Sequence, residues 1–245
     1  MFFIGGDFLS KSRSVWGNYK NDSVKCILKN TLLASGGLML FALGVYFTIQ
    51  ANVGVAPWEA FNIGLSKTIG IKYGTASIAV SAVIVVADIL LKEKIGIGMF
   101  LDAVLVGKTV DLLNFFDPVP LVENNLLLSL VLIAVGMFIM GFSQFLYMKA
   151  ALGCGPRDTL LVGLKRRVKK VPIGLISVAI LAAVTLVAFV LGGPIGPGTL
   201  ICALLEGPIM QLDFKIVRFD PTATVHQDIL SSFRVITGRK GCGKT

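Results

Sequence analysis

Four long apolar stretches constrain the fold of this chain more than any other feature of its sequence. They cover residues 27–50, 75–91, 126–148 and 173–191. A helix rises about 1.5 Å per residue, so roughly 20 residues span the hydrocarbon core of a bilayer. The composition agrees, because 55% of the 245 residues are hydrophobic and only 15% are charged, against about 25% charged in soluble domains. The chain is therefore predicted to be an all-α polytopic membrane protein.

An internal repeat divides the membrane part into two halves. The segment 51–65 aligns without gaps with 150–164, and both copies read A-x-x-G-x-[AG]-P-x-[ED]-x-x-x-x-G-L. Further matches follow at an offset of 100, including an I-G-x-G and an L-x-G segment. Self-similarity at a fixed period indicates a duplicated structural unit. Each half is predicted to contain a long span, a short helix that begins at a proline (57–67 and 156–167), a second span and a weaker third apolar segment.

The third apolar segments, 98–116 and 195–212, decide how the halves are related. If both cross the membrane, the two copies are inverted relative to each other, whereas two crossings per half make them parallel. Six crossings with the N-terminus inside place 20 of the 23 Lys and Arg on the cytoplasmic side, as the positive-inside rule favours. We therefore predict six transmembrane helices as two inverted three-helix repeats, with both termini cytoplasmic. Five spans stay open as an alternative, because 195–212 is short and contains Glu206.

Four parts follow from this arrangement. They are a cytoplasmic N-terminal segment at 1–29, a first membrane repeat at 30–116, a second at 126–213, and a basic cytoplasmic tail at 214–245. In the tail, apolar residues at 225, 229, 233 and 236 share one helical stripe. This stripe predicts a short amphipathic helix on the membrane surface.

The last eight residues contain a nucleotide-binding pattern out of context. From Gly238 to Thr245 they match G-x-x-x-x-G-K-[ST] letter for letter. A P-loop needs a strand before it and a helix after it, because the phosphates rest on amides at the start of that helix. The chain stops at Thr245, so no nucleotide binding is predicted.

The repeated motif supplies the first candidate binding residues. Pro57 and Pro156 suit the first position of a helix, where the missing N–H costs nothing. Glu59 and Asp158 then fall in the first turn, near the positive end of the helix dipole. Interrupted helices of this kind form substrate and ion sites in many secondary transporters. Ordinary helix-start chemistry explains the same residues, and the two roles are compatible.

Further polar and ionisable side chains lie in or near the apolar segments. A charge in hydrocarbon costs about 2.5–3.5 kcal/mol on insertion scales, so such residues usually face the interior of the bundle or a wet cavity. Lys108 and Asp111 are three residues apart, within pairing reach on one helix face, and such a pair would neutralise itself without binding anything. The candidate substrate or ion pathway comprises Gln50, Asn52, Pro57, Glu59, Asp102, Lys108, Asp111, Gln144, Pro156, Asp158 and Glu206.

The segment FALGVYFTIQANVGVAPWE at 41–59, with KEKIGIG at 92–98, resembles the YczE/YyaS/YitT family of bacterial integral membrane proteins. The resemblance extends over about 30–220. It implies a small multi-span protein of the bacterial plasma membrane. It supplies neither a substrate nor a catalytic residue.

Two classes of function compete at this point. Inverted halves, interrupted helices and acids within the spans favour a small-solute or ion transporter, secondary or facilitative. The alternative is a non-transporting scaffold or accessory protein that assists a membrane-associated enzyme or regulator. An enzyme is not expected, because one histidine, His226, and four scattered cysteines leave no acid–base pair, metal site or cofactor site. The expected partners are the lipid bilayer and an unknown small solute or ion, without nucleic acid, and a homo-oligomer stays open.

Overall fold

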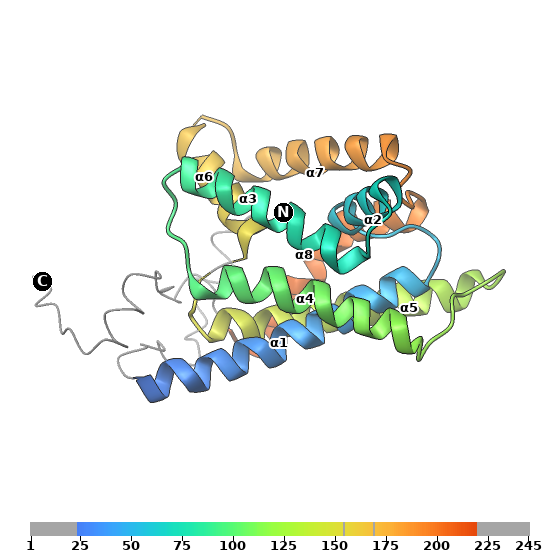
Figure 1. Ribbon diagram of the computed structural model, residues 1–245, viewed down its shortest axis with the longest axis horizontal. Coiled ribbons are helices and arrows are strands. Elements are labelled where there is room, and N and C mark those ends of the chain that lie inside the picture. Colours follow the sequence, from blue (N-terminus) through green and yellow to red (C-terminus); the bar gives the residue numbers. More distant parts are fainter. Residues whose placement is uncertain (1–23, 154, 169, 220–245) are drawn as a thin grey trace, which may run out of the picture.

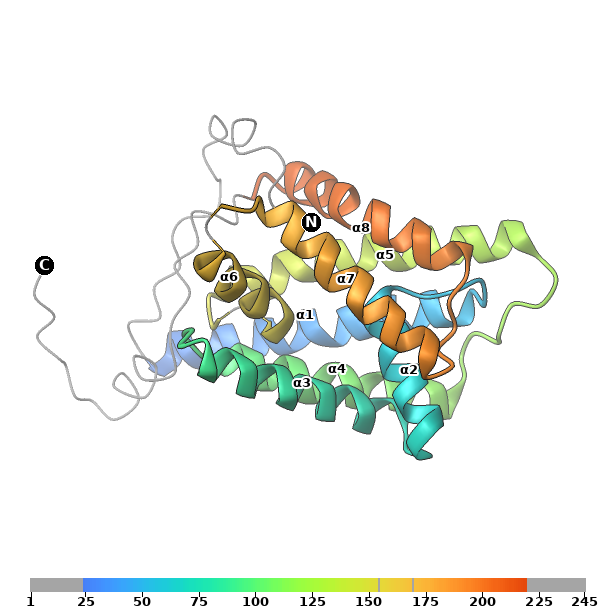
Figure 2. The same cartoon turned by 90° about the horizontal axis from the view of Figure 1, so that it is seen from above.

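The computed structural model describes residues 24–153, 155–168 and 170–219, and this part of the chain consists of eight helices without strands. Their bounds are α1 (Val24–Gln50), α2 (Pro57–Ile69), α3 (Tyr73–Leu90), α4 (Ile97–Phe116), α5 (Leu126–Lys149), α6 (Pro156–Arg167), α7 (Ile173–Val190) and α8 (Pro197–Ile216). The six longer helices lie roughly along the longest axis of the molecule, and the short helices α2 and α6 lie toward opposite ends of it (Figures 1 and 2). The all-helical prediction is confirmed for the described residues.

Most helix limits agree closely with those predicted, and α8 differs most. It runs to Ile216 although the apolar pattern ends near 212, because Phe214 is buried and packs edge-on against Phe219, which in turn packs against Phe145 of α5. The predicted limit of the second repeat at 213 therefore falls inside α8. The limit at 29 likewise falls inside α1, which begins at Val24. The predicted amphipathic stripe and the P-loop-like end lie outside the described residues.

Four of the helices, α1, α3, α5 and α7, are long and apolar enough to cross a membrane. Helices α4 and α8 have 20 residues each, a length of about 30 Å at 1.5 Å per residue. They are more polar, since α4 carries Asp102, Lys108 and Asp111 and α8 carries Glu206 and Asp213. Length and apolarity alone therefore identify four spans, and these two properties do not show that α4 and α8 also cross the membrane.

Helices α1 and α5, the first helix of each half, make the most extensive contact in the molecule. They cross at Gly44 and Gly136, where a Cβ added to Gly136 would lie 2.8 Å from the carbonyl oxygen of Gly44. Small residues let two helix backbones approach in this way. This crossing forms the centre around which the remaining helices pack.

The two halves also exchange matching backbone hydrogen bonds. The amide of Gly98, at the start of α4, donates to the carbonyl of Leu152 at 2.9 Å. The amide of Gly198, at the start of α8, donates to the carbonyl of Val53 at 2.8 Å. Each motif segment between a long and a short helix is therefore anchored by the other half of the chain.

Glycine is required where these segments meet. Gly54 and Gly153 have φ of 102° and 119°, a region that residues with a Cβ rarely adopt. A Cβ on Gly54 would lie 2.6 Å from the amide of Gly196, and one on Gly153 would lie 2.7 Å from Cα of Gly96. The repeated glycines of the sequence thus form two equivalent contacts between the halves.

One pair of equivalent helices differs between the halves. Helix α3 packs along α4, where a Cβ on Gly107 would lie 2.8 Å from the carbonyl of Gly74. Helix α7 packs on α2 and has almost no contact with α8. Of the 18 residues of α7 only Ser177 and Ala188 are buried. The second half is therefore open along a line where the first half is closed.

Candidate functional site

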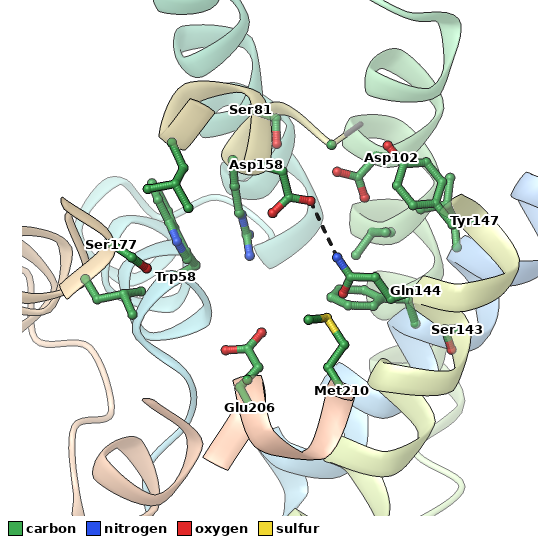
Figure 3. A pocket seen from close by; sticks show the side chains of 18 of the residues that line it. Trp58, Ser81, Asp102, Ser143, Gln144, Tyr147, Asp158, Ser177, Glu206 and Met210 are labelled. Carbon is green, nitrogen blue, oxygen red and sulfur yellow. Dashed lines mark hydrogen bonds between the residues drawn. The ribbon is translucent and has the colours of Figure 1, made fainter. Parts of the chain in front are cut away.

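A cavity of about 150 Å³ lies between the helices, and its lining residues come from all eight of them. Figure 3 shows side chains of its wall. A single water needs roughly 10–15 Å³ by this measure, so the cavity has room for a small solute. Its wall combines apolar and aromatic side chains with ionisable ones, the combination typical of small-molecule sites. The polar part consists of Ser77, Ser81, Asp102, Ser143, Gln144, Tyr147, Arg157, Asp158, Ser177 and Glu206.

The two copies of the repeated motif meet at this cavity. Nη1 of Arg157 donates to Oε1 of Glu59 at 2.8 Å, an ion pair between α6 and α2. The guanidinium carbon of Arg157 also lies 5.1 Å from the centroid of the Trp58 ring, within the range of a cation–π interaction. Trp58 and Arg157 occupy the same position of the repeat, as do Glu59 and Asp158. Equivalent first turns of the two short helices therefore face each other across the junction of the halves.

Local backbone structure explains why these side chains point inward. Pro57 and Pro156 begin α2 and α6, as predicted, so each first turn starts at a fixed place after an anchored segment. Glu59 is only 3% exposed, and its carboxylate bonds to Arg157 of the other half. Helix-start chemistry alone therefore does not account for Glu59.

Three carboxylates line the cavity, those of Asp102, Asp158 and Glu206. Oδ2 of Asp158 lies 3.5 Å from Nε2 of Gln144, a long hydrogen bond (Figure 3). Asp102 of α4 is close to Asp158, because a Cβ built on Gly155 would lie 3.1 Å from Asp102 Oδ2 and 3.8 Å from Asp158 Oδ2. Glu206 of α8 is exposed at the cavity and approaches from the side opposite to these two (Figure 3).

The charge of this wall is unbalanced. Asp102, Asp158 and Glu206 supply three carboxylates, whereas the cavity wall contains one guanidinium, that of Arg157, which is paired with Glu59. Within the described residues no group of three His, Cys, Asp or Glu side chains is close enough to hold a metal ion. The carboxylates are therefore distributed around the space and do not converge on one point.

Two predicted pathway residues serve a different contact. Nε2 of Gln50 donates to Oδ1 of Asp117 at 2.8 Å, and Nδ2 of Asn52 donates to the carbonyl of Val122 at 3.2 Å. Both acceptors belong to the loop between α4 and α5. Gln50 and Asn52 thus tie this loop to the end of α1 and do not line the cavity.

The predicted pairing of Lys108 with Asp111 is wrong, because Asp111 bonds to a different helix. Oδ1 of Asp111 accepts a hydrogen bond from the amide of Gly74 at 2.7 Å. This amide lies in the first turn of α3, where backbone N–H groups have no partner in their own helix. Lys108 is exposed, and the ion pairs found among the described residues are Arg157 with Glu59 and Arg166 with Glu93. Asp111 therefore joins α4 to α3.

Arg157 and Trp58 line the cavity and were not predicted from the sequence. Both stand at the variable position of the motif, directly before its acid, so the residue in one copy does not predict the residue in the other. Their equivalence in the repeat was the available signal, because both stand directly before the acid of the motif, in the first turn of a short helix. Tyr147 and the cavity serines had no comparable signal.

The family model that matches this chain covers residues 28–214 and describes a family of unknown function, DUF6198. The uncharacterized membrane protein YczE of Bacillus subtilis is 33% identical over 181 residues, which is 71% of this chain and 80% of that protein. The uncharacterized protein YyaS of the same organism is 28% identical over 183 residues, covering 74% and 90% of the two chains. An uncharacterized protein of Haemophilus influenzae is 25% identical over 185 residues, covering 74% and 83%. No solved structure matches the chain.

These matches confirm the predicted resemblance to YczE and YyaS, and its extension to YitT stays a prediction. The matching segment includes all eight helices except the first residues of α1 and the last of α8. Together with four helices apolar enough to cross a bilayer, the similarity to a membrane protein indicates that this chain is an integral membrane protein.

Proposed function

The chain belongs to the DUF6198 family of unknown function, and we propose that it carries a small solute across the bacterial plasma membrane through its central cavity. The observation that supports this proposal is a charged cavity enclosed by the helices of both halves. Ionisable groups are costly within a bilayer and persist where they line a pathway or a binding site. A scaffold has no need of such a cavity.

The proposal includes six crossings arranged as two inverted repeats. Helices α4 and α8 match α3 and α7 in length and lie along the same axis (Figures 1 and 2). Asp102 and Glu206 on these helices line the cavity, which removes the main objection to placing them within the bilayer. The distribution of Lys and Arg then favours cytoplasmic termini.

The mechanism we propose is alternating access, in which the two halves of the chain exchange their helix arrangements. Inverted repeats permit two mirrored states, in which each half adopts the arrangement that the other had before. Here α3 is closed on α4 while α7 stands away from α8, so the solute enters between α7 and α8. In the opposite state α7 closes on α8 and α3 leaves α4. The Arg157–Glu59 pair, at the junction, holds the halves together during the exchange.

A cavity-filling substitution tests transport against the scaffold alternative. Ala203 lines the cavity, so Ala203→Phe should abolish complementation in a strain whose growth requires the protein, at an unchanged membrane level. Leu204 is the next residue on α8 and is 53% exposed, so Leu204→Phe is the matched control and should complement normally. Full complementation by the cavity-filled variant would contradict transport and favour a scaffold.

A further inference from the structure

We propose that the solute is a polyatomic organic cation, an ammonium compound with an apolar portion, bound between Asp102, Asp158, Glu206 and the aromatic wall of the cavity. This inference rests on the proposed function, because it names the class of solute taken by the same cavity. It is carried by the charge, the shape and the side-chain chemistry of the wall.

The charge of the wall selects a cation. Arg157 is engaged by Glu59 at 2.8 Å and stacks over Trp58. Asp102, Asp158 and Glu206 form no ion pair with a Lys or Arg in the part of the chain that the structure describes. The group missing from the cavity is therefore a positive charge, which such carboxylates bind by charge-assisted hydrogen bonds.

The same arrangement disfavours an anion. A carboxylate or phosphate solute would lie within a few ångströms of three acids, and like charges at that distance repel strongly in a site of low dielectric constant. The single guanidinium is already paired. An anionic solute would have to displace Glu59 from Arg157 before it gained a partner.

The distribution of the acids favours a polyatomic cation over a metal ion. A bare divalent cation needs several oxygens within about 2.0–2.6 Å of one point. The described residues contain no convergent cluster of three ligands, and Glu206 approaches from the side opposite to Asp102 and Asp158 (Figure 3). A molecule with several N–H donors spans such a space, whereas a bare ion leaves carboxylates without a contact.

The rest of the wall matches the apolar part of such a molecule. Trp58, Phe41 and Tyr147 supply aromatic surface, and Leu38 and Met210 supply aliphatic surface. The Arg157 guanidinium stacked over Trp58 demonstrates that this ring already takes a cation on its face. An alkylammonium thus finds carboxylates for its head and apolar side chains for its tail.

Thermal unfolding of the purified full-length protein in detergent tests the inference with n-butylammonium, butyrate and Mg²⁺ at equal ionic strength. A ligand that binds only the folded state raises the midpoint of unfolding, and above the dissociation constant the rise grows with the logarithm of the ligand concentration. We expect a rise with butylammonium that follows this dependence, and none with butyrate or Mg²⁺. Asp102→Asn and Asp158→Asn should each raise the dissociation constant obtained from this dependence at least tenfold. Glu123→Gln removes an exposed acid of the α4–α5 loop and should leave it unchanged.

A second measurement separates lost binding from lost folding. The chain has two tryptophans, Trp16 and Trp58, so a Trp16→Phe variant reports on the cavity alone. Butylammonium should change its fluorescence, and the half-saturating concentration should equal the dissociation constant found by unfolding. Stabilisation by Mg²⁺ that disappears in Asp102→Asn would overturn the organic cation in favour of a metal ion.

The remaining outcomes distinguish this inference from the proposed function. Stabilisation by butyrate that is lost in Arg157→Gln would overturn the cation while leaving a solute site in the cavity. Absence of any response to all three probes would overturn the cation as well. The proposed function fails only if Ala203→Phe also complements fully.

Discussion

The helix pairs α3–α4 and α7–α8 are built on one sequence plan and adopt two arrangements. Gly74 and Gly107 bring α3 against α4, and glycine stands at the equivalent positions 174 and 207, yet α7 is hardly in contact with α8. The capacity for close approach is thus present in both halves and used in one. Under the proposed exchange between two states, this contrast places the movable part at α7, while α1, α5 and the two motif segments form the common frame.

The largest expected effect comes from breaking the junction that both halves share. Glu59→Gln leaves the guanidinium of Arg157 without its 2.8 Å partner, and Arg157→Gln leaves a carboxylate that is only 3% exposed. Removal of one member of a buried pair costs about 3–5 kcal/mol, and we expect the lower end because Arg157 is partly accessible. Thermal unfolding in detergent measures the loss.

The double variant Glu59→Gln/Arg157→Gln is the control for this prediction. It removes both charges, so it should recover part of the stability lost in either single variant. Additive losses would mean that the two side chains act independently, and the pair would then not join the halves.

A smaller effect is expected from widening the closed pair. Gly107→Ala places a methyl group 2.8 Å from the carbonyl of Gly74, and overpacking of this kind costs about 1–3 kcal/mol. Gly207→Ala is the matched control on α8, where α7 makes almost no contact. Alanine there stabilises the helix by up to about 1 kcal/mol relative to glycine. The midpoints of unfolding should therefore fall for Gly107→Ala alone. An equal fall in both variants would show that the two pairs are packed alike.

Accessibility of equivalent positions tests the same contrast without a change in packing. Ser81 of α3 is 5% exposed, whereas Leu181 of α7, at the equivalent position, is half-buried, and both line the cavity. In a cysteine-free background, Leu181→Cys should react with a water-soluble maleimide about ten times faster than Ser81→Cys, because the side chain at 181 is more exposed. A tenfold ratio corresponds to about 1.4 kcal/mol. Equal rates would mean that the cavity is entered from both sides or from neither.

How well the sequence predicts a feature of this molecule depends on whether neighbouring or distant residues determine that feature. The helices follow from local patterns, as at Pro57 and Pro156, and the cost of a charge in a bilayer pointed to Asp102 and Glu206, which line the cavity. Features decided between distant residues were missed. The ion pair of Arg157 with Glu59 joins residues 98 positions apart, and the end of α8 depends on the packing of Phe214.

The separation of α7 from α8 belongs to the same group of missed features. The repeat predicts that both halves have the same plan, and so it predicts equal packing in both. The unequal packing of α3 and α7 depends on the contacts that each helix makes with the rest of the molecule, which the repeat does not predict. In the sequence, the reason for this difference in packing has to lie in the residues that differ between the two copies.

Asp111 is one such residue, and its replacement has the smallest effect that we predict. Its carboxylate accepts a hydrogen bond from the Gly74 amide at 2.7 Å, and the equivalent position on α8 is Gln211. Asp111→Gln gives α4 the residue that α8 carries and replaces a charge-assisted hydrogen bond by a neutral one, which is about half as strong. The expected loss of stability is about 1 kcal/mol or less, with a several-fold faster reaction of Ser81→Cys with maleimide. Lys108→Gln, on the exposed side of the same helix, is the control and should change neither quantity. If Asp111→Gln lowers stability but leaves Ser81→Cys unreactive, Asp111 only satisfies the first turn of α3, and the reason why α3 is closed while α7 is open lies elsewhere in the contact with α4.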